Sequence, residues 1–102
     1  ERFQKNTSLA IKNSSKKIEL KTFKDKSINA LSKLITNQKS NYFDFIYIDG
    51  FHRYDYVLRD CYNAWDCLKI GGIIACDDYI WQAWNDIKLN PCYAINKFIY
   101  FK

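Results

Sequence analysis

The sequence predicts an α/β domain built on a parallel sheet. Segments with the apolar pattern of β-strands alternate with segments of helical period along the 102 residues. This strict alternation favours parallel strands joined by right-handed crossovers. Acidic residues follow directly after two of the predicted strands, where the open edge of such a sheet binds ligands. The composition, 48% hydrophobic and 18% aromatic, supports a folded core and excludes wholesale disorder.

The first third of the chain is predicted to contain a helix, a strand and a second helix. Residues 1–10 have the pattern of a helix end, and a polar turn follows at residues 12–15. Lys17–Lys21 alternates polar and apolar side chains, which predicts a strand with one solvated face. Ser27 is expected to cap the next helix, which runs to residue 36 or 37 before a polar loop at residues 37–42. The apolar positions of that helix are Ile28, Leu31, Leu34 and Ile35.

The rest of the chain is predicted to contain two strands around the clearest helix. Phe43–Ile48 is apolar and β-prone apart from Asp44, and Gly72–Cys76 reads as a short buried strand. Residues 54–68 between them form an amphipathic helix. Its apolar stripe is expected to hold Val57, Leu58, Cys61, Ala64, Trp65 and Leu68, and its polar face Arg59, Asp60, Asn63 and Asp66. Gly71 and Gly72 are expected to end this helix, and Pro91 to begin a last one.

Length and composition favour a single small domain that continues beyond the first residue. A chain of 102 residues holds at most one domain. It contains no Met and opens within a helical pattern, so we expect further sequence before Glu1. No apolar run approaches the length of a membrane span or of a signal-peptide core, so no membrane partner is expected. The four cysteines show neither a C-x-x-C pair nor zinc spacing, which predicts free thiols in a reducing compartment, the cytoplasm.

The charge of the chain is uneven. Residues 1–39 hold ten Lys and Arg against three Asp and Glu, a net +7, and residues 40–102 hold six against eight, a net −2. A nucleic-acid-binding surface is one interpretation of the basic part. The basic residues lack the interleaved Arg and aromatic side chains of a stacking platform, so a solvated surface is the preferred interpretation.

Carboxylates and the single histidine gather after the predicted strands. Asp49 follows Phe43–Ile48 directly, and His52 comes three residues later. Asp77 and Asp78 follow Gly72–Cys76 in the same way. Because ligands bind beyond the carboxyl ends of parallel strands, this arrangement predicts an active site at one edge of the sheet.

The segments around these residues resemble a known enzyme family. The motifs are IDGFHRY at residues 48–54, VLRD at 57–60, LKIGGII at 68–74 and DDYIW at 77–81. Together they are similar to class I S-adenosylmethionine-dependent methyltransferases, in particular the small-molecule O-methyltransferase group. The likeness covers roughly residues 18–81.

The resemblance implies a Rossmann-like three-layer sandwich with a partial parallel sheet. Lys17–Lys21, Phe43–Ile48 and Gly72–Cys76 would be its third, fourth and fifth strands. The first two strands and the glycine-rich donor loop would then precede Glu1. Residues 1–102 would form a single, N-terminally truncated methyltransferase domain, which we expect to be inactive by itself.

The resemblance also implies which residues contact the donor, S-adenosylmethionine. The Gly-x-Ser of the family stands here as Asp25-Lys26-Ser27, which places Asp25 and Ser27 on cofactor-binding positions without the glycine that lets the backbone approach the adenine. Asp49 and Phe51 would contact the donor as well. An ordinary core aromatic is an equal alternative for Phe51.

In the cation-dependent members, an Asp after the fourth strand and an Asp-Asn pair after the fifth hold magnesium. Asp49, Asp77 and Asp78 fall on those positions, with Asp in place of Asn at the last. Carboxylates suit Mg²⁺, which binds oxygen ligands in octahedral array. The alternative is that Asp77 and Asp78 only begin a turn or cap a helix.

His52 is a candidate general base. Methyl transfer requires alignment of the acceptor and removal of its proton, and an imidazole can take that proton near neutral pH. His52 lies where the catechol-type enzymes place a lysine base. It could instead orient its loop or contact the donor. Tyr79, Trp81 and Trp84 could form an aromatic wall for the acceptor, or a helix-packing cluster.

The functional hypothesis is therefore O-methylation of a small hydroxylated acceptor, catalysed by His52 and Asp49 with S-adenosylmethionine and a divalent cation such as Mg²⁺. A truncated remnant that binds no donor and a basic nucleic-acid-binding module over residues 1–39 are the alternatives. A homo-oligomer is left open.

Overall fold

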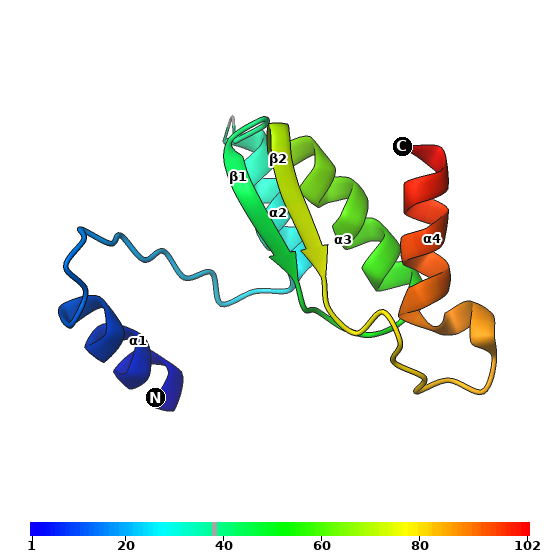
Figure 1. Ribbon diagram of the computed structural model, residues 1–102, viewed down its shortest axis with the longest axis horizontal. Helices are drawn as coiled ribbons and strands as arrows, with labels where there is room; N and C mark the ends of the chain where they lie inside the picture. The colour runs from blue at the N-terminus through cyan, green and yellow to red at the C-terminus, as the bar shows by residue number, and fades with distance from the viewer. Residues whose placement is uncertain (38) are drawn as a thin grey trace.

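The elements of the computed structural model, which describes residues 1–37 and 39–102, alternate much as the sequence predicts. In chain order they are α1 (Arg2–Lys12), α2 (Ser27–Thr36), β1 (Phe43–Ile48), α3 (Tyr54–Cys67), β2 (Leu68–Cys76), the 3₁₀-helix η1 (Ile87–Leu89) and α4 (Pro91–Phe101). β1 and β2 lie side by side in front of α2 and α3, and α4 lies beside α3 (Figure 1). The fold is mixed α/β with a two-stranded parallel sheet, consistent with part of a Rossmann-like domain.

The two strands pair in parallel and end together. Phe45 pairs with Ile73, and the register runs on to Ile48 opposite Cys76. The pair before it is Phe43 with Leu68. Between these two pairs β2 therefore advances five residues while β1 advances two. Gly71, inside this irregular stretch, has a φ of +81°, a conformation that strains residues with a Cβ.

β2 begins four residues earlier than predicted, at Leu68 instead of Gly72. α3 has already ended at Cys67, so the prediction that Gly71 and Gly72 end the helix is wrong. The loop before β1 satisfies the last carbonyls of α3, because the Tyr42 amide donates to Cys67 at 2.9 Å. Residue 38 of the predicted loop at 37–42 lies outside the described residues.

The predicted strand at Lys17–Lys21 is absent, which corrects the expected sheet from three strands to two. The segment is extended and solvent-exposed, with Ile18 and Leu20 about half accessible. An extended segment becomes a strand only by pairing with a neighbour. In the doubly wound order 3-2-1-4-5-6 the third strand borders the second, so the counterparts of the fourth and fifth strands are not its partners.

The core lies where α3 packs against α4 and the sheet. Its buried members are Val57, Cys61, Ala94, Ile95 and Phe98. The predicted apolar stripe of α3 is thus confirmed at Val57, Cys61 and Ala64. Trp65 keeps 43% of its surface exposed at the margin, although its ring contacts that of Phe98 at 5.9 Å. Leu68 is buried, but as the first residue of β2.

The helices that contact the strands leave apolar side chains of the sheet exposed. Phe45, Tyr47 and Ile73 are 57%, 55% and 61% exposed, whereas their neighbours Ile46, Ile48 and Ile74 are half-buried. Because side chains alternate along a strand, the first three share one face of the sheet. We call them the open sheet face. The described residues form one helical layer and one sheet layer.

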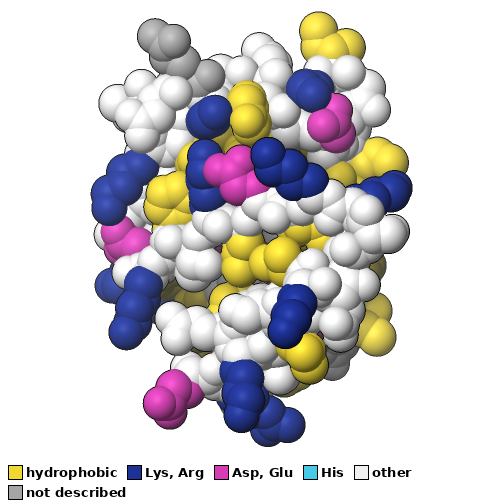
Figure 2. Space-filling view, turned by 90° about the vertical axis from the view of Figure 1, so that its left-hand side faces the viewer, with side chains coloured by type: hydrophobic (Ala, Val, Ile, Leu, Met, Phe, Trp, Pro, Cys, Tyr) yellow, Lys and Arg dark blue, Asp and Glu magenta, His cyan; other side chains and the backbone are white. Residues whose placement is uncertain are grey.

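α1 stands apart from the other elements, at the end of an extended segment (Figure 1). None of its residues is buried. On the side of the molecule that carries α1, Lys and Arg side chains are scattered among hydrophobic and acidic ones and form no continuous basic track (Figure 2). Among the described residues, no helix has both the length and the apolar character needed to cross a membrane.

The four cysteines are free thiols, with Cys61 and Cys67 buried and Cys76 and Cys92 half-buried. The sulfur atoms of Cys61 on α3 and Cys76 on β2 lie 3.9 Å apart. The contact links the helix to the last residue of the strand that precedes Asp77 and Asp78.

Candidate active site

The carboxyl ends of β1 and β2 bring the predicted acidic residues to one edge of the sheet. The pairing continues one residue past β2, because the Asp77 amide donates to the Ile48 carbonyl at 2.9 Å. Asp49, the residue after Ile48, therefore lies next to the Asp77-Asp78 pair. The sequence predicted this meeting because parallel strands end at the same edge.

Asp49, His52 and Asp78 form a cluster that we call the edge cluster. Each offers one ligand atom, and the three atoms all lie within 4.8 Å of one another. His52 Nδ1 lies 3.0 Å from Asp78 Oδ2. Asp78 has a φ of +56°, in the left-handed region that Asp tolerates better than most residues. The chain therefore turns at Asp78, directly after the extended strand.

Asp77 lies outside the edge cluster. A hydrogen bond with the Tyr47 hydroxyl is the main cause that lowers the pKa of Asp77, and the Asp78 amide, which donates to Asp77 Oδ1 at 2.9 Å, is the second. The same contact raises the pKa of Tyr47 to about 12, because the negative carboxylate disfavours a phenolate beside it. Of the three residues predicted to bind a metal ion, the structure thus brings Asp49 and Asp78 together with His52, and Asp77 lies outside this group.

Two indole rings hold His52 in place. Its ring lies 5.1 Å from that of Trp81, centroid to centroid. Trp84 Nε1 donates to the backbone carbonyl of His52 at 3.0 Å. With Nδ1 facing Asp78, the second ring nitrogen, Nε2, is the one left to accept a proton or bind an ion.

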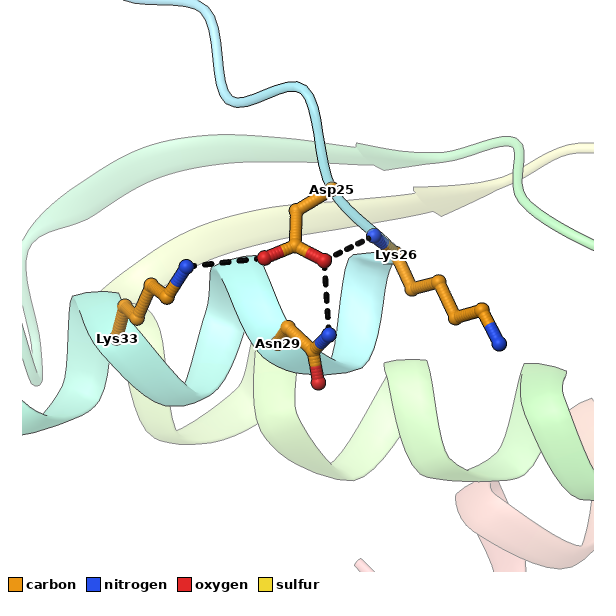
Figure 3. Close-up of polar contacts among 4 residues, drawn as sticks. All are labelled: Asp25, Lys26, Asn29 and Lys33. Atoms are coloured by element: carbon orange, nitrogen blue, oxygen red, sulfur yellow. Dashed lines mark hydrogen bonds and ion pairs between the residues drawn. The ribbon is translucent and has the colours of Figure 1, made fainter.

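Asp25 lies two residues before α2 and contacts residues of its first two turns (Figure 3). Its carboxylate accepts from the Lys26 amide at 2.8 Å, from Asn29 Nδ2 at 2.8 Å and from Lys33 Nζ at 2.9 Å. These contacts, led by the one with Asn29, lower the pKa of Asp25 to about 2. Asp25 lines neither of the two cavities described below, so its cofactor-binding role stays a prediction.

Ser27 is the first residue of α2 and not its cap, which corrects the predicted capping position to Lys26. The Ser27 side chain turns to α3, where Oγ lies 2.9 Å from both carboxylate oxygens of Asp60. A hydroxyl that binds Asp60 in this way cannot bond the backbone at the start of α2. Ser27 thus joins α2 to α3.

Asp60 was expected on the solvated face of α3, and this expectation is wrong, because only 4% of its surface is exposed. Burial is the main cause that raises the pKa of Asp60, and the hydrogen bond from Ser27 opposes it. The burial of Asp60 could have been predicted from its spacing to the apolar residues of α3. Asp60 follows Val57 by three residues and precedes Ala64 by four, so it lies on the buried stripe of α3.

Ser27 and Phe51 meet at a cavity of about 410 Å³ between the start of α2 and the loop after β1. The Phe51 ring packs edge-on against Tyr56 at 5.0 Å. A second cavity of about 260 Å³ is lined by Ser27, Asp49 and Asp60 among others. Of the four predicted cofactor-binding residues, the structure thus gathers Ser27, Asp49 and Phe51 around adjoining cavities.

Gly50 lies between these cavities, at a position that only glycine fills without adjustment. A Cβ there would be 3.0 Å from Asp60 Oδ2. The buried carboxylate therefore packs directly against the backbone that joins Asp49 to Phe51.

Comparison with known proteins finds a family that matches most of the chain. The family described as Methyltransferase domain matches residues 3–79. No curated protein and no solved structure matches the chain. The matched region covers more than half of the 102 residues and includes both strands and all three residues of the edge cluster. The chain therefore belongs to the methyltransferase domain family.

Proposed function

We propose that the protein is a class I methyltransferase with a Rossmann-like fold that uses S-adenosylmethionine and methylates the hydroxyl oxygen of a small molecule. The observation that carries this proposal is the edge cluster, in which a histidine is oriented by one carboxylate and faced by another within 4.8 Å. It lies beyond the carboxyl ends of two parallel strands, where open α/β sheets bind their ligands.

The cavity of about 410 Å³ is the proposed site for the adenosine part of the donor. Its lining combines the aromatic rings of Phe51 and Tyr56 with the start of α2, a combination that suits a flat base and a polar sugar. Bound there, the donor would supply a methyl group on positively charged sulfur, which the acceptor oxygen takes as the carbon–sulfur bond breaks. Asp49 would face the sulfonium side of the donor.

His52 is the proposed general base. Asp78 holds Nδ1–H, which leaves the lone pair of Nε2 to take the proton of the acceptor hydroxyl. The Asp78 carboxylate then stabilises the imidazolium that forms. This pairing of His with a buried or half-buried carboxylate orients the ring and fixes its tautomer.

The donor assignment is tested by calorimetry with S-adenosylhomocysteine on the native protein. Loss of base stacking on Phe51 should weaken binding of Phe51→Ala about tenfold. Tyr100→Ala, at a position 83% exposed near the end of α4, is the matched control and should bind as the parent does. Unchanged affinity of Phe51→Ala would remove the donor from this cavity.

The base assignment is tested by turnover. His52→Ala should lower kcat on the order of a hundredfold, because proton removal then falls to water. Asp78→Asn should lower kcat as well, with the affinity for S-adenosylhomocysteine unchanged. A loss below about threefold in His52→Ala would leave His52 a binding role only.

A divalent ion at the edge cluster is the second candidate, favoured by the 4.8 Å grouping of its ligand atoms. The donor set fits an ion, but it is two carboxylates and an imidazole in place of the three carboxylates predicted. Mixed oxygen and nitrogen ligands suit Mn²⁺ at least as well as Mg²⁺. The ion would lower the pKa of an acceptor hydroxyl bound to it.

The two candidates differ in their response to a chelator. Turnover that persists in EDTA excludes an essential ion, and turnover that needs Mn²⁺ or Mg²⁺ supports one at the edge cluster. In the second case Asp49→Asn should weaken the ion's binding, measured by calorimetry with MnCl₂. Asp77→Asn is the matched control, because Asp77 lies outside the edge cluster and should leave that binding within about twofold.

The face that carries α1 gives the basic-module alternative no support. Lys and Arg side chains on the face that carries α1 are scattered among acidic and hydrophobic ones (Figure 2). Nucleic-acid surfaces instead align basic side chains along the backbone that they follow.

A further inference from the structure

The loop between β1 and α3 carries two residues of the proposed site and has no regular structure of its own. Residues 49–53 belong to no helix or strand. Among them, Phe51 lines the proposed donor cavity and His52 belongs to the edge cluster. The Phe51 side chain is 55% exposed, so little of it is held by the core. A short exposed loop keeps neighbouring side chains in fixed positions only through contacts from other segments.

Trp84 provides contacts to both of these residues. Its indole N–H, which can only donate, bonds the His52 carbonyl at 3.0 Å. Its ring packs edge-on against that of Phe51, with the centroids 6.4 Å apart and the ring planes at 73°. Trp84 itself is half-buried. One side chain from the irregular segment after β2 therefore contacts the proposed base and the proposed donor-binding aromatic at the same time.

Asn90 holds Trp84 in turn. Asn90 Oδ1 accepts from the Trp84 amide at 3.1 Å, and Asn90 Nδ2 donates to the Trp84 carbonyl at 3.0 Å. Only 5% of the Asn90 surface is exposed, and a buried amide that is bonded at both ends holds its partner in one arrangement. Asn90 directly precedes α4, which packs into the core through Ala94 and Ile95. The core of the domain therefore sets the position of Trp84.

We propose that Trp84 is a positioning residue of the site, which sets the His52 ring against Asp78 through its indole N–H and supports Phe51 at the donor cavity through its ring. Asn90 is the second part of this device, because it holds the Trp84 backbone. The inference rests on the proposed function and adds to it the residues that keep the base and the donor-binding aromatic in place. Trp84 acts through His52 and Phe51.

The tautomer of His52 distinguishes a positioning role from a purely structural one. His52 is the only histidine of the chain, so its ring nitrogens give a single pair of NMR signals. Because Nδ1 lies 3.0 Å from Asp78 Oδ2, the neutral ring should carry its proton on Nδ1. The two nitrogen shifts at alkaline pH measure the ratio of this tautomer to the Nε2–H form. Loss of a merely structural contact would lower the unfolding free energy and leave that ratio unchanged in the folded protein.

Trp84→Phe removes the N–H and keeps a ring against Phe51. We expect the ratio of the Nδ1–H to the Nε2–H tautomer to fall about threefold, because one hydrogen bond no longer fixes the His52 backbone. Trp65→Phe, the same substitution at the margin of the core, is the matched control and should leave the ratio unchanged. An unchanged ratio in Trp84→Phe would overturn the role of Trp84 toward His52.

Trp84→Ala removes the ring as well. It should lower the tautomer ratio as Trp84→Phe does, and in addition weaken S-adenosylhomocysteine binding about fivefold by calorimetry, because Phe51 loses its neighbour. Unchanged affinity in Trp84→Ala would overturn the role toward Phe51. Asn90→Ala should lower the tautomer ratio without altering Trp84 itself. Asn96→Ala, on α4 and bonded to Tyr79, is its control. Equal ratios in the two asparagine variants would overturn the role of Asn90.

The outcomes separate this inference from the proposed function. Normal binding of S-adenosylhomocysteine by the native protein, with an unchanged tautomer ratio in Trp84→Phe, would overturn the positioning of His52 alone. Absence of donor binding in the native protein would overturn the proposed function and the role toward Phe51. The tautomer ratio needs neither donor nor turnover, so it would still decide the role toward His52.

Discussion

At the scale of single residues, Asp60 connects the segments that surround the proposed donor site. It lies on α3, accepts a hydrogen bond from the hydroxyl of Ser27 on α2, and packs against the backbone of Gly50 after β1. A buried carboxylate with so few partners is costly to ionise. Its position therefore couples the protonation of one side chain to the geometry of the loop that carries Asp49 and Phe51.

Asp60 should make the protein less stable as pH rises. Burial raises its pKa above 3.8 in the folded state, so the folded protein holds the proton more tightly than the unfolded chain does. The stabilising effect is full below about pH 4 and is lost as pH rises through the folded-state pKa. The unfolding free energy of Asp60→Asn, measured in urea, should lack this decline and match or exceed that of the parent at pH 7. A parallel pH dependence in both proteins would contradict this expectation.

Asp60→Ala is the complementary change. It removes the acceptor of the Ser27 hydroxyl and leaves space against Gly50, and should cost about 1–3 kcal/mol of unfolding free energy. Denaturant titration of Asp60→Asn and Asp60→Ala side by side separates the effect of charge from that of packing. Equal stability of the two variants would show that the contact with Ser27 contributes nothing.

Asp25 should have the opposite pH dependence. Its pKa falls from 3.8 to about 2 in the folded protein, so its contribution is present above about pH 4 and is lost as pH falls to about 2. The difference in unfolding free energy between the parent and Asp25→Asn should therefore shrink over that range. Acid titrations monitored by circular dichroism measure it, and a constant difference from pH 5 to pH 2 would refute the assignment.

The sequence predicted the position of the site better than it predicted which partner each of its side chains contacts. The strand ends fixed the meeting of Asp49 with Asp77 and Asp78, because register follows from the parallel pairing. The left-handed turn at Asp78 directs two successive carboxylates to different partners, His52 and Tyr47. Periodicity carries no information about such a turn, since a single positive φ depends on the loop that follows.

At the scale of elements, β2 depends on a glycine within it. Gly71 has a φ of +81°, and a Cβ there would meet nothing within 4 Å. Gly71→Ala should therefore cost about 1–2 kcal/mol from backbone strain alone. Gly71→Asn should cost less, because Asn tolerates the left-handed region. Urea unfolding of both variants checks this, and equal losses would point to a cause other than the backbone.

Elements that pack on the core are among those that the sequence predicted well. α3, β1 and α4 begin within a residue of their predicted positions, because their apolar periods match the core that they form. Lys17–Lys21 has the alternation of a strand but no neighbour, and it stays unpaired. A pattern of side chains predicts which face a strand would bury, whereas the hydrogen bonds that make it a strand come from another segment.

At the scale of the whole molecule, α1 should contribute little to stability. It has no buried residue, and the core consists of residues from α3 and α4 with partly buried neighbours. Removal of residues 1–13 should change the unfolding free energy of the 102-residue chain by less than about 0.5 kcal/mol. Denaturant titration measures this value. A loss above about 1 kcal/mol would mean that α1 packs on the domain in solution.

The open sheet face should promote association between copies of the 102-residue chain. Exposed apolar side chains beside two unpaired strand edges are a common cause of association. Light scattering should show a mass that rises with concentration, and Phe45→Lys should reduce this rise. Tyr100→Lys, at a position on α4 that is also exposed, is the control. Equal masses for Phe45→Lys and the parent would exclude this face as the contact.

The neighbouring sulfur atoms of Cys61 and Cys76 bear on how samples should be handled. Their mutual hydrogen bond lowers the pKa of Cys76 and is the main cause that raises the pKa of Cys61. The Cys76 thiolate attacks hydrogen peroxide and becomes a sulfenic acid as hydroxide leaves. The Cys61 thiol, 3.9 Å away, can then displace water from that sulfenic acid to form a disulfide. Such a crosslink would join α3 covalently to β2, the strand that precedes Asp77. Purification under a reductant, with an intact-mass spectrum before each titration, would keep this oxidation from being mistaken for a loss of ligand binding.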